Sequence, residues 1–314
     1  GRPAALKRLS RRAALLFVIG IFYSGGFRNE WPDIRLLGVL QRLALGYFFG
    51  GLIFCFLRRR GMAVAGVSLL VGYWVLMTFV PIRNIQLDDE HLDLVVKQTG
   101  EHDVAVHFNA VTERVTGRYE PGLNLSNHLD YQYLPGKKWN KYWDPEGYLS
   151  TLPAIVTCLL GIFAGMLLRD KTVDDLRKVK LLALAGAGCL LAGFLWGLQF
   201  PIVKKIWTSS FVLVAGGWSF LLLAVFYLVI DVWKMQRWCR PFVWVGMNSI
   251  TIYLANNLLG FRKVAERFVG GDVKNFVNDA MMKGLGDLLV ALAGLGLSIL
   301  FVWYLHRRKI FLRL

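Results

Sequence analysis

The chain has 314 residues, of which 55% are hydrophobic, and a formal net charge of +16 at pH 7. A soluble domain is about 45–50% apolar and does not gather its apolar residues into blocks of about 20, the length that crosses a bilayer. The composition therefore excludes an ordinary soluble domain. Because no DNA- or RNA-binding motif accompanies the positive charge, we expect no nucleic-acid partner.

Blocks of apolar residues predict an all-α integral membrane protein with about eight transmembrane helices. They lie at about 12–27, 36–57, 62–82, 149–168, 181–200, 209–233, 241–261 and 284–305. The sequence thus divides into three helices (1–82), a large outer loop on the periplasmic or lumenal substrate side (83–148), and five helices (149–314). Alternation in DVAVHFNAV (103–111) predicts a short strand or β-hairpin within that loop.

Basic residues are distributed unevenly between the two predicted sides. Twenty of the 37 Lys and Arg residues, with four of the 21 acids, fall in the N-terminal segment, near 58–60, 169–180 and 231–240, and after residue 306. This is the positive-inside pattern, so both termini are predicted to be cytoplasmic. The four cysteines lie in spans or at their cytoplasmic edges, and we expect no structural disulfide.

The second block carries polar groups where hydrocarbon is expected. In DIRLLGVLQRLALGYFFGG, Gln41 and Arg42 lie about two turns inside, and Arg35 falls on the same face of a helical wheel as Arg42. An Arg in a span costs at least about 2.5 kcal/mol on insertion scales. Two kinds of partner would offset this cost: a carboxylate of a neighbouring helix, or a phosphate or pyrophosphate, which suits the guanidinium fork.

A second polar cluster ends the outer loop, in KYWDPEGYLS. Asp144 and Glu146 directly precede the fourth block, where acids also favour a helix N-terminus. Trp143 is one of several aromatic residues here. Rings beside carboxylates are typical of sugar-binding surfaces, and aromatic belts at a membrane interface are the alternative. Upstream, Asp130 is a third acid, and His128 is either an ordinary loop histidine or a general base.

The seventh block contains VGMNSITIYLANN (245–257), which is unusually polar for a span. On a helical wheel, Ser249, Tyr253 and Asn256 form one stripe, with Asn248 beside it. Such a stripe faces inward. It serves either hydrogen bonding between helices or the polar wall of a ligand cavity.

Several motifs occur in a characteristic order. They are IRLLGVLQRLALGYFF, NLSNHLDYQYLPG, YWDPEGYLSTLPAIVTCLLGIFAGMLL, KIWTSSFVLVAGGWSFLLLAVFYLVIDV, FVWVGMNSITIYLANN and RRKIFLRL. In this order and spacing, the chain resembles the heparan-alpha-glucosaminide N-acetyltransferase family of multi-pass membrane enzymes, in its shorter bacterial members. The resemblance runs from about residue 8 to the C-terminus, apart from the stretch at about 84–120.

The resemblance implies an acetyl-CoA-dependent N-acetyltransferase of the bacterial inner membrane. It would move the acetyl group from cytosolic acetyl-CoA to the amino group of a glucosamine-type sugar on the outer side. The implied acetyl-CoA site comprises Arg35, Gln41, Arg42, Ser209, Ser210, Asn248, Ser249 and Asn256. The implied sugar side comprises Asp130, Trp143, Asp144 and Glu146.

The catalytic residue stays unassigned, because the family's active-site histidine belongs to a region upstream of Gly1. We therefore expect the chain to be a fragment that lacks about two N-terminal helices, and we expect no metal site. Three alternatives stay open: a transporter of a small polar or anionic solute, a membrane scaffold, and an O-acyltransferase acting on an envelope glycan. The identity of the acceptor sugar and the formation of a homodimer are also left open.

Overall fold

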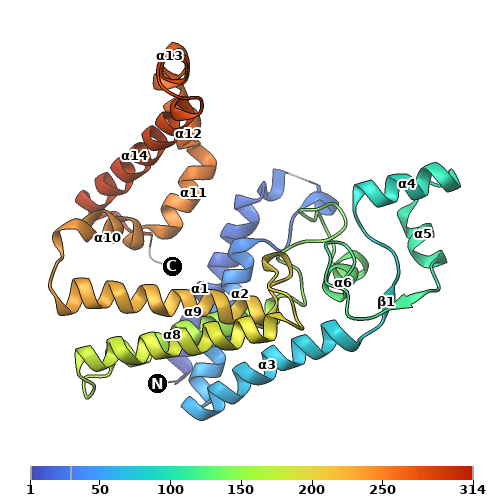
Figure 1. Ribbon diagram of the computed structural model, residues 1–314, viewed down its shortest axis with the longest axis horizontal. Coiled ribbons are helices and arrows are strands. Elements are labelled where there is room, and N and C mark those ends of the chain that lie inside the picture. Colours follow the sequence, from blue (N-terminus) through green and yellow to red (C-terminus); the bar gives the residue numbers. More distant parts are fainter. Residues whose placement is uncertain (1, 29, 313–314) are drawn as a thin grey trace. The chain divides into compact units, whose positions relative to one another are not determined.

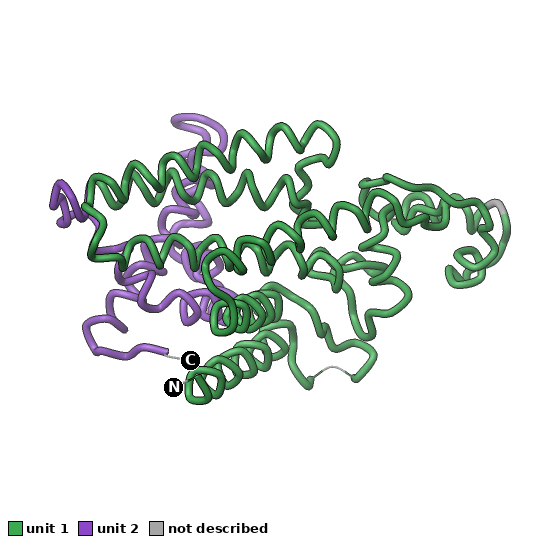
Figure 2. Tube along the Cα trace, turned by 90° about the horizontal axis from the view of Figure 1, so that it is seen from below, with its two compact units in different colours: residues 1–228 green, residues 229–314 purple. Residues whose placement is uncertain are grey.

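The computed structural model describes residues 2–28 and 30–312, which are predominantly helical. They form two compact units, residues 1–228 and 229–314, each of which is described by itself (Figure 2). The all-α class is confirmed. The expected division of the chain at residues 82 and 148 concerns the two sides of a membrane, and it stays a prediction. Arg313 and Leu314, which end the expected cytoplasmic C-terminal segment, lie outside the described residues.

Unit 1 contains most of the long helices. Its main elements are α1 (Arg2–Tyr23), α2 (Val39–Phe56), α3 (Arg59–Phe79), β1 (Ile82–Arg83), α4 (Asp89–Thr99), α5 (Val104–Ala110), β2 (Arg114–Val115), α6 (Leu125–Tyr133), α7 (Thr151–Arg169), α8 (Asp175–Gly197) and α9 (Ser209–Tyr227). Short 3₁₀ turns lie at Gly26–Arg28, Trp31–Asp33 and Lys204–Ile206.

Six helices of the described residues are long and apolar enough to cross a membrane. They are α2, α3, α7, α8, α14 (Leu285–Arg307) and the helix Ser209–Val232, in which α9 continues into the π-helical turn η4 (Leu228–Val232). Their length and apolar composition support a membrane protein. The expected count of eight is not supported, because the first and seventh blocks do not form such helices.

The first block forms α1, which differs from the expected span at 12–27. The helix begins at Arg2 and carries five Lys and Arg residues within its first 11 positions, so no 18-residue stretch of it is apolar throughout. It ends at Tyr23, and the two glycines Gly25 and Gly26 follow with φ angles of 111° and 60°. Such angles favour glycine, and they stop the helix before residue 27.

The long loop 83–148 is folded, and its strand was predicted in the wrong place. Residues 104–110 of the alternating stretch form helix α5, because the Asp103 side chain accepts a hydrogen bond from the Ala105 N–H (2.8 Å) and caps a helix start. The sheet consists instead of β1 and β2, which pair antiparallel with Ile82 opposite Val115. Helices α4 and α5 lie beyond the C-terminal end of α3, and α6 lies beside that end (Figure 1).

Close packing joins the membrane helices of unit 1. Helices α8 and α9 lie side by side (Figure 1), and a Cβ at Gly186 of α8 would come within 2.9 Å of the Gly217 carbonyl oxygen. Small residues thus let the two backbones approach closely. At the other end of the bundle, the buried Tyr73 of α3 donates its hydroxyl hydrogen bond to the Ile206 carbonyl oxygen (2.5 Å). This contact fixes the segment that leads into α9.

Unit 2 breaks the seventh apolar block. Its elements are the 3₁₀ turn η5 (Arg237–Cys239), α10 (Arg240–Met247), α11 (Ser249–Leu259), α12 (Phe261–Val269), α13 (Asp272–Ala280) and α14. The continuous helix expected over 241–261 is wrong, because the Asn248 backbone (φ −125°, ψ 28°) leaves the helical region and separates α10 from α11. Asn is a weaker helix former than Ala or Leu, and the Asn248 side chain itself makes no hydrogen bond in the described part of the chain.

Candidate functional site

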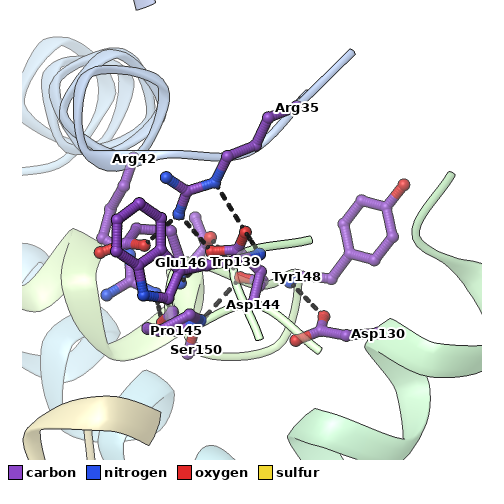
Figure 3. A network of polar contacts seen from close by, with 11 residues as sticks. Arg35, Arg42, Asp130, Trp139, Asp144, Pro145, Glu146, Tyr148 and Ser150 are labelled. Carbon is purple, nitrogen blue, oxygen red and sulfur yellow. Dashed lines mark hydrogen bonds and ion pairs between the residues drawn. The ribbon is translucent and has the colours of Figure 1, made fainter. Parts of the chain in front are cut away.

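The DPEG turn, residues 144–147, lies between α6 and α7 and is organised by a buried carboxylate. Asp144 is 1% exposed. It accepts hydrogen bonds from Arg35 Nε (2.8 Å) and Nη2 (2.7 Å), and from the N–H groups of Trp139 (2.9 Å) and Glu146 (3.0 Å). A carboxylate has about four acceptor positions, so these bonds fill them. Asp144 therefore holds the turn and has no acceptor position left for a sugar hydroxyl (Figure 3).

Arg35 is the partner of this turn. It precedes α2, which begins at Val39, so it does not share a helical wheel with Arg42 as expected. Besides its two bonds to Asp144, Arg35 Nη2 contacts Glu146 Oε2 at 2.8 Å, and its guanidinium stacks over the Trp139 ring at 5.1 Å. The structural ion pair, one of the two partners weighed for the arginines, is thus what Arg35 forms.

Arg42 is different, because it forms no ion pair among the described residues. It is 6% exposed and lies within α2. Its Nη2 donates to the Pro145 carbonyl oxygen and to Ser150 Oγ, each at 2.5 Å, and its guanidinium lies 4.7 Å from the centroid of the Trp207 ring. Its Nε and Nη1 are buried and have no hydrogen-bond partner in the described part of the chain. A buried cation with two unused donors favours an anionic or strongly polar ligand.

A cavity of about 640 Å³ opens beside Arg42, and we call it the Arg42 cavity. It lies among α1, α2, α7 and the segment that precedes α9. Its wall is apolar except for a few groups, among them Arg42, Glu146 and Lys204. The volume falls in the range of small-molecule sites, about 300–1,000 Å³, and the combination of apolar wall and few polar groups is typical of them. The cavity suits a flexible, mostly apolar arm that ends in a polar or anionic group.

Glu146 is the carboxylate that reaches this cavity. Its Oε2 accepts from Arg35, while its side chain also contributes to the cavity wall. Burial raises the pKa of Glu146 above its usual range, and the neighbouring Asp144 carboxylate raises it further, although Arg42 and Arg35 oppose this. A carboxyl group with a raised pKa in a cavity is able to exchange a proton or to hold an ammonium group.

Asp130 contacts the residue that follows the DPEG turn. It lies in α6 with no exposed surface, and its Oδ1 accepts the Tyr148 N–H at 3.0 Å. Its Oδ2 has no partner among the described residues, and a Cβ added at Gly147 would overlap this carboxyl group. Burial raises the pKa of Asp130 to about 7. Asp130 is not part of the Arg42 cavity wall, so the structure gives it contact with the turn rather than with that cavity.

His128 and Trp143 pack inside the folded loop. His128 Nε2 lies 3.1 Å from the Ile85 carbonyl oxygen, and burial lowers the pKa of His128 to about 4. This environment fits the ordinary loop histidine. Trp143 is 3% exposed and belongs to an apolar cluster with Phe108, so its ring is covered. Trp139, which is 69% exposed, is the ring beside the carboxylates that a sugar is able to reach.

Gln41, Ser209 and Ser210 are placed close to the bundle core. Ser209 Oγ donates to the Leu70 carbonyl oxygen (2.7 Å), and Ser210 Oγ donates to the Phe200 carbonyl oxygen (2.6 Å). These bonds tie the start of α9 to its neighbours, and neither serine is part of the Arg42 cavity wall. Gln41 is buried, and its Nε2 has no partner in the described ranges.

The polar residues of the seventh block lie in unit 2. Ser249, Tyr253 and Asn256, the predicted stripe, line one cavity of about 540 Å³. Asn248 is 2% exposed, and neither its Nδ2 nor its Oδ1 has a hydrogen-bond partner in the part of the chain that the structure describes. A role of these residues toward acetyl-CoA stays a prediction.

The tertiary structure adds residues that sequence reasoning missed. Trp207, Lys204 and Thr157 line the Arg42 cavity, and the Trp207 Nε1 donates to Thr157 Oγ1 at 3.2 Å. The signal for Trp207 was present in the sequence, because it directly precedes the Thr208–Ser210 stretch of one quoted motif. Its left-handed backbone (φ 53°) was not predictable from that pattern.

Comparison with curated proteins identifies distant relatives. The chain is 27% identical over 347 residues to heparan-alpha-glucosaminide N-acetyltransferase of Homo sapiens, which covers 98% of this chain and 49% of that protein. It is 29% identical over 299 residues to the Mus musculus protein of the same name, covering 81% and 42%. The chain thus spans about half the length of the curated relatives it matches. No protein-family model matches the chain. The resemblance expected from the motifs is confirmed as a distant relationship.

Proposed function

We propose that this chain, a distant relative of heparan-alpha-glucosaminide N-acetyltransferases, forms the core of a membrane acetyltransferase. Its donor would be acetyl-CoA, approached from the cytoplasm, and its acceptor the amino group of a glucosamine-type sugar on the outer side. A bacterial inner membrane with cytoplasmic termini is part of this proposal. The observation that carries it is the pair of unused buried donors of Arg42 at the wall of an apolar cavity.

The reaction joins an amine to a thioester carbonyl. The acceptor ammonium first loses a proton, the amine nitrogen attacks the carbonyl carbon, and the carbon–sulfur bond breaks as the N–C bond remains. The leaving thiolate takes the second proton of the nitrogen. In the proposed arrangement the pantetheine arm lies in the Arg42 cavity, whose apolar wall excludes water from the thioester.

Arg42 and Glu146 would have different roles in the reaction. The free Nε–H and Nη1–H of Arg42 are able to donate to an oxygen that gains negative charge, either the thioester oxygen or a phosphate of the donor. Glu146 would hold the acceptor ammonium and take its proton, which its raised pKa favours. Arg35 and Asp144 would keep Glu146 in place through the bonds that organise the turn.

Substitution of Arg42 tests the proposal. In the full-length protein, we expect Arg42→Leu to weaken acetyl-CoA binding about 10- to 150-fold, because a charge-assisted hydrogen bond is worth about 1.5–3 kcal/mol. Arg42→Lys should retain part of the affinity, since it keeps the charge and loses the fork. The measurement is equilibrium binding of labelled acetyl-CoA, followed by acetyl transfer in vesicles with acetyl-CoA only on the cytoplasmic side and glucosamine only on the outer side.

Arg60→Leu is the matched control, because it removes one positive charge from an exposed position at the start of α3. Unchanged binding in Arg42→Leu with a lower melting temperature would show that Arg42 is structural and would contradict the proposal. Failure of the full-length protein to acetylate any amino sugar would move the assignment to a transporter.

A further inference from the structure

A second cavity, in unit 2, has a different character. It measures about 870 Å³ and opens where the segment Lys234–Arg240 meets the C-terminal end of α14. Four cations line it: Lys234, Arg237, Arg240 and Arg307. We call this cavity the basic pocket. Both chain segments belong to the side on which Lys and Arg are concentrated, so the pocket is expected to face the cytoplasm.

The four cations lack internal counter-charges. No Asp or Glu lines the basic pocket, and within residues 2–28 and 30–312 none of the four forms an ion pair. All four side chains are exposed, so a solute is able to reach them. Like charges around one concave space repel each other, and a low-dielectric wall strengthens that field. An anion that enters the pocket would remove this repulsion.

Aromatic rings complete the basic pocket. Trp244 and Trp303 line it together with His306. The Trp244 and His306 rings lie 6.2 Å apart, and the Arg307 guanidinium lies 5.5 Å from the centroid of the Trp303 ring. The Nδ1 of His306 is buried and has no hydrogen-bond partner among the described residues. Indole faces beside guanidinium groups offer stacking and hydrogen bonding together.

The positive-inside pattern explains only part of this arrangement. It accounts for Lys and Arg in cytoplasmic loops, and it predicts nothing about where they point. It does not explain why four cations from two distant segments surround one cavity without an acid. Guanidinium forks match phosphate oxygens.

We propose that the basic pocket of unit 2 binds a phosphorylated ligand. The shared chemistry is a phosphate diester or diphosphate, and its source is either a soluble nucleotide, whose base stacks on an indole ring, or an anionic phospholipid headgroup. The basic pocket shares no lining residue with the Arg42 cavity, and the proposal does not depend on acetyl transfer. Binding is measured directly, so its failure and the failure of the proposed function are distinguishable.

The experiment uses the whole protein in nanodiscs and three probes. ADP tests a nucleotide, inorganic pyrophosphate tests the phosphates alone, and phosphatidylglycerol in a phosphatidylcholine disc tests a lipid headgroup, with retention read by native mass spectrometry. We expect the double variant Arg237→Gln/Arg240→Gln to lose at least about tenfold in affinity for the probe that binds. Binding to the unaltered protein should weaken as salt rises, because salt screens exposed charges.

Two further variants identify the source. Trp244→Leu should weaken ADP binding about 5- to 150-fold and leave pyrophosphate binding unchanged if a base stacks on this ring. If phosphatidylglycerol is retained instead, the ligand is a lipid. Lys263→Gln/Arg267→Gln, in α12, removes the same charge from unit 2 outside the pocket and should bind like the unaltered protein.

The proposal is overturned if none of the three probes binds the unaltered protein, or if the pocket and control variants bind alike. Should Arg237→Gln/Arg240→Gln fail to fold, as judged by its melting temperature without probe, the lysine pair Arg237→Lys/Arg240→Lys replaces it. That pair keeps the charge and loses the fork, and it should still weaken pyrophosphate measurably.

Discussion

Individual carboxyl groups in this protein acquire different properties from their surroundings. Asp144 and Asp130 are both buried near the DPEG turn. Asp144 accepts from an arginine and two N–H groups, whereas Asp130 accepts from the Tyr148 N–H and its Oδ2 has no partner among the described residues. The second arrangement leaves burial as the largest influence, and it raises the pKa of Asp130 to about 7. The residue type alone did not distinguish the two.

The raised pKa of Asp130 predicts how stability depends on pH. Its folded pKa of about 7 exceeds the unfolded value near 3.9, so the folded state binds the extra proton between these values. The stabilisation is complete below pH 4 and is lost as pH rises through 7, at most on the order of 4 kcal/mol. Asp130→Asn removes this term, so its melting temperature relative to the unaltered protein should rise between pH 5 and pH 8.

The test compares how steeply the melting temperature changes with pH in the two proteins, since other groups titrate in the same pH range. Burial lowers the pKa of His128 to about 4, which makes the protein less stable as pH falls from 6.5 to 4 in both variants alike. Asp93→Asn, an exposed change on α4, should leave the slope as it is. Identical slopes in Asp130→Asn and the unaltered protein would show that Asp130 is ionised throughout.

At the level of elements, the turn before α7 and the segment before α2 are joined by one ion pair. Arg35 contacts Asp144 through two nitrogens, and its partner has no exposed side-chain surface. Because α2 and α7 both line the Arg42 cavity, this pair fixes the entrance of one helix against the other. The sequence distance of 109 residues between the partners put this contact beyond any local pattern.

Removing one partner of the Arg35–Asp144 pair should destabilise the protein strongly. The costs of the two single changes should therefore add up to more than the cost of the double change. We expect Arg35→Met to cost about 3–5 kcal/mol, since it leaves the Asp144 carboxylate buried without its cation. In a double-mutant cycle, Arg35→Met/Asp144→Asn should be at least about 1 kcal/mol more stable than the sum of the single changes predicts. The measurement is denaturant unfolding in detergent micelles.

An exposed ion pair of the same chain serves as the control. Arg59 and Asp170 lie 3.7 Å apart, and the arginine side chain is 69% exposed, so Arg59→Met should change stability little. Additive effects at Arg35 and Asp144 would mean that the two side chains do not act as a pair.

At the scale of the whole molecule, the charge pattern and the helix lengths predict different numbers of membrane crossings. Within residues 2–28 and 30–312, six helices are long and apolar enough to span, whereas alternating basic loops require α1 and the broken pair α10–α11 to cross as well. With the six long helices alone, the basic N-terminal segment and the basic segment after 306 would lie on one side, and the basic segments at 58–60, 169–180 and 231–240 on the other. Broken helices do cross membranes when their freed backbone groups face protein or a water-filled cavity. We therefore keep the crossing of α10–α11 as a prediction.

Site-directed labelling distinguishes these topologies. Single cysteines at Lys97, Lys171 and Lys263, in a background with the four native cysteines replaced by serine, are treated with an impermeant maleimide from each side. Lys97 and Lys263 should label from outside and Lys171 from the cytoplasm. Labelling of Lys263 from the cytoplasm would show that α10–α11 does not cross, and equal sidedness at Lys97 and Lys171 would refute the outer placement of 83–148.

The sequence by itself determined the class of this protein and drew attention to Arg42 and Glu146, which line the Arg42 cavity. Blocks of about 20 apolar residues predict membrane helices, because hydrocarbon thickness acts on each block separately. Arg42 and Glu146 stood out because a charged side chain in or near a membrane is energetically costly unless it is paired or binds a ligand. Helix starts and breaks were less predictable. The Asp103 side chain caps a helix start through a hydrogen bond, and the Asn248 backbone leaves the helical region, so each overrides the apolar pattern locally.

Only the tertiary structure decided which polar groups have ion-pair or hydrogen-bond partners and which keep unused donors. Arg35 and Arg42 look alike in sequence, but Arg35 is paired with carboxylates and Arg42 keeps two buried donors at a cavity. Likewise, the basic pocket unites two segments that are nearly 70 residues apart. The physical reason is the same in each case. A hydrogen bond or a cavity wall depends on which segments fold against each other, and that information is spread over the whole chain.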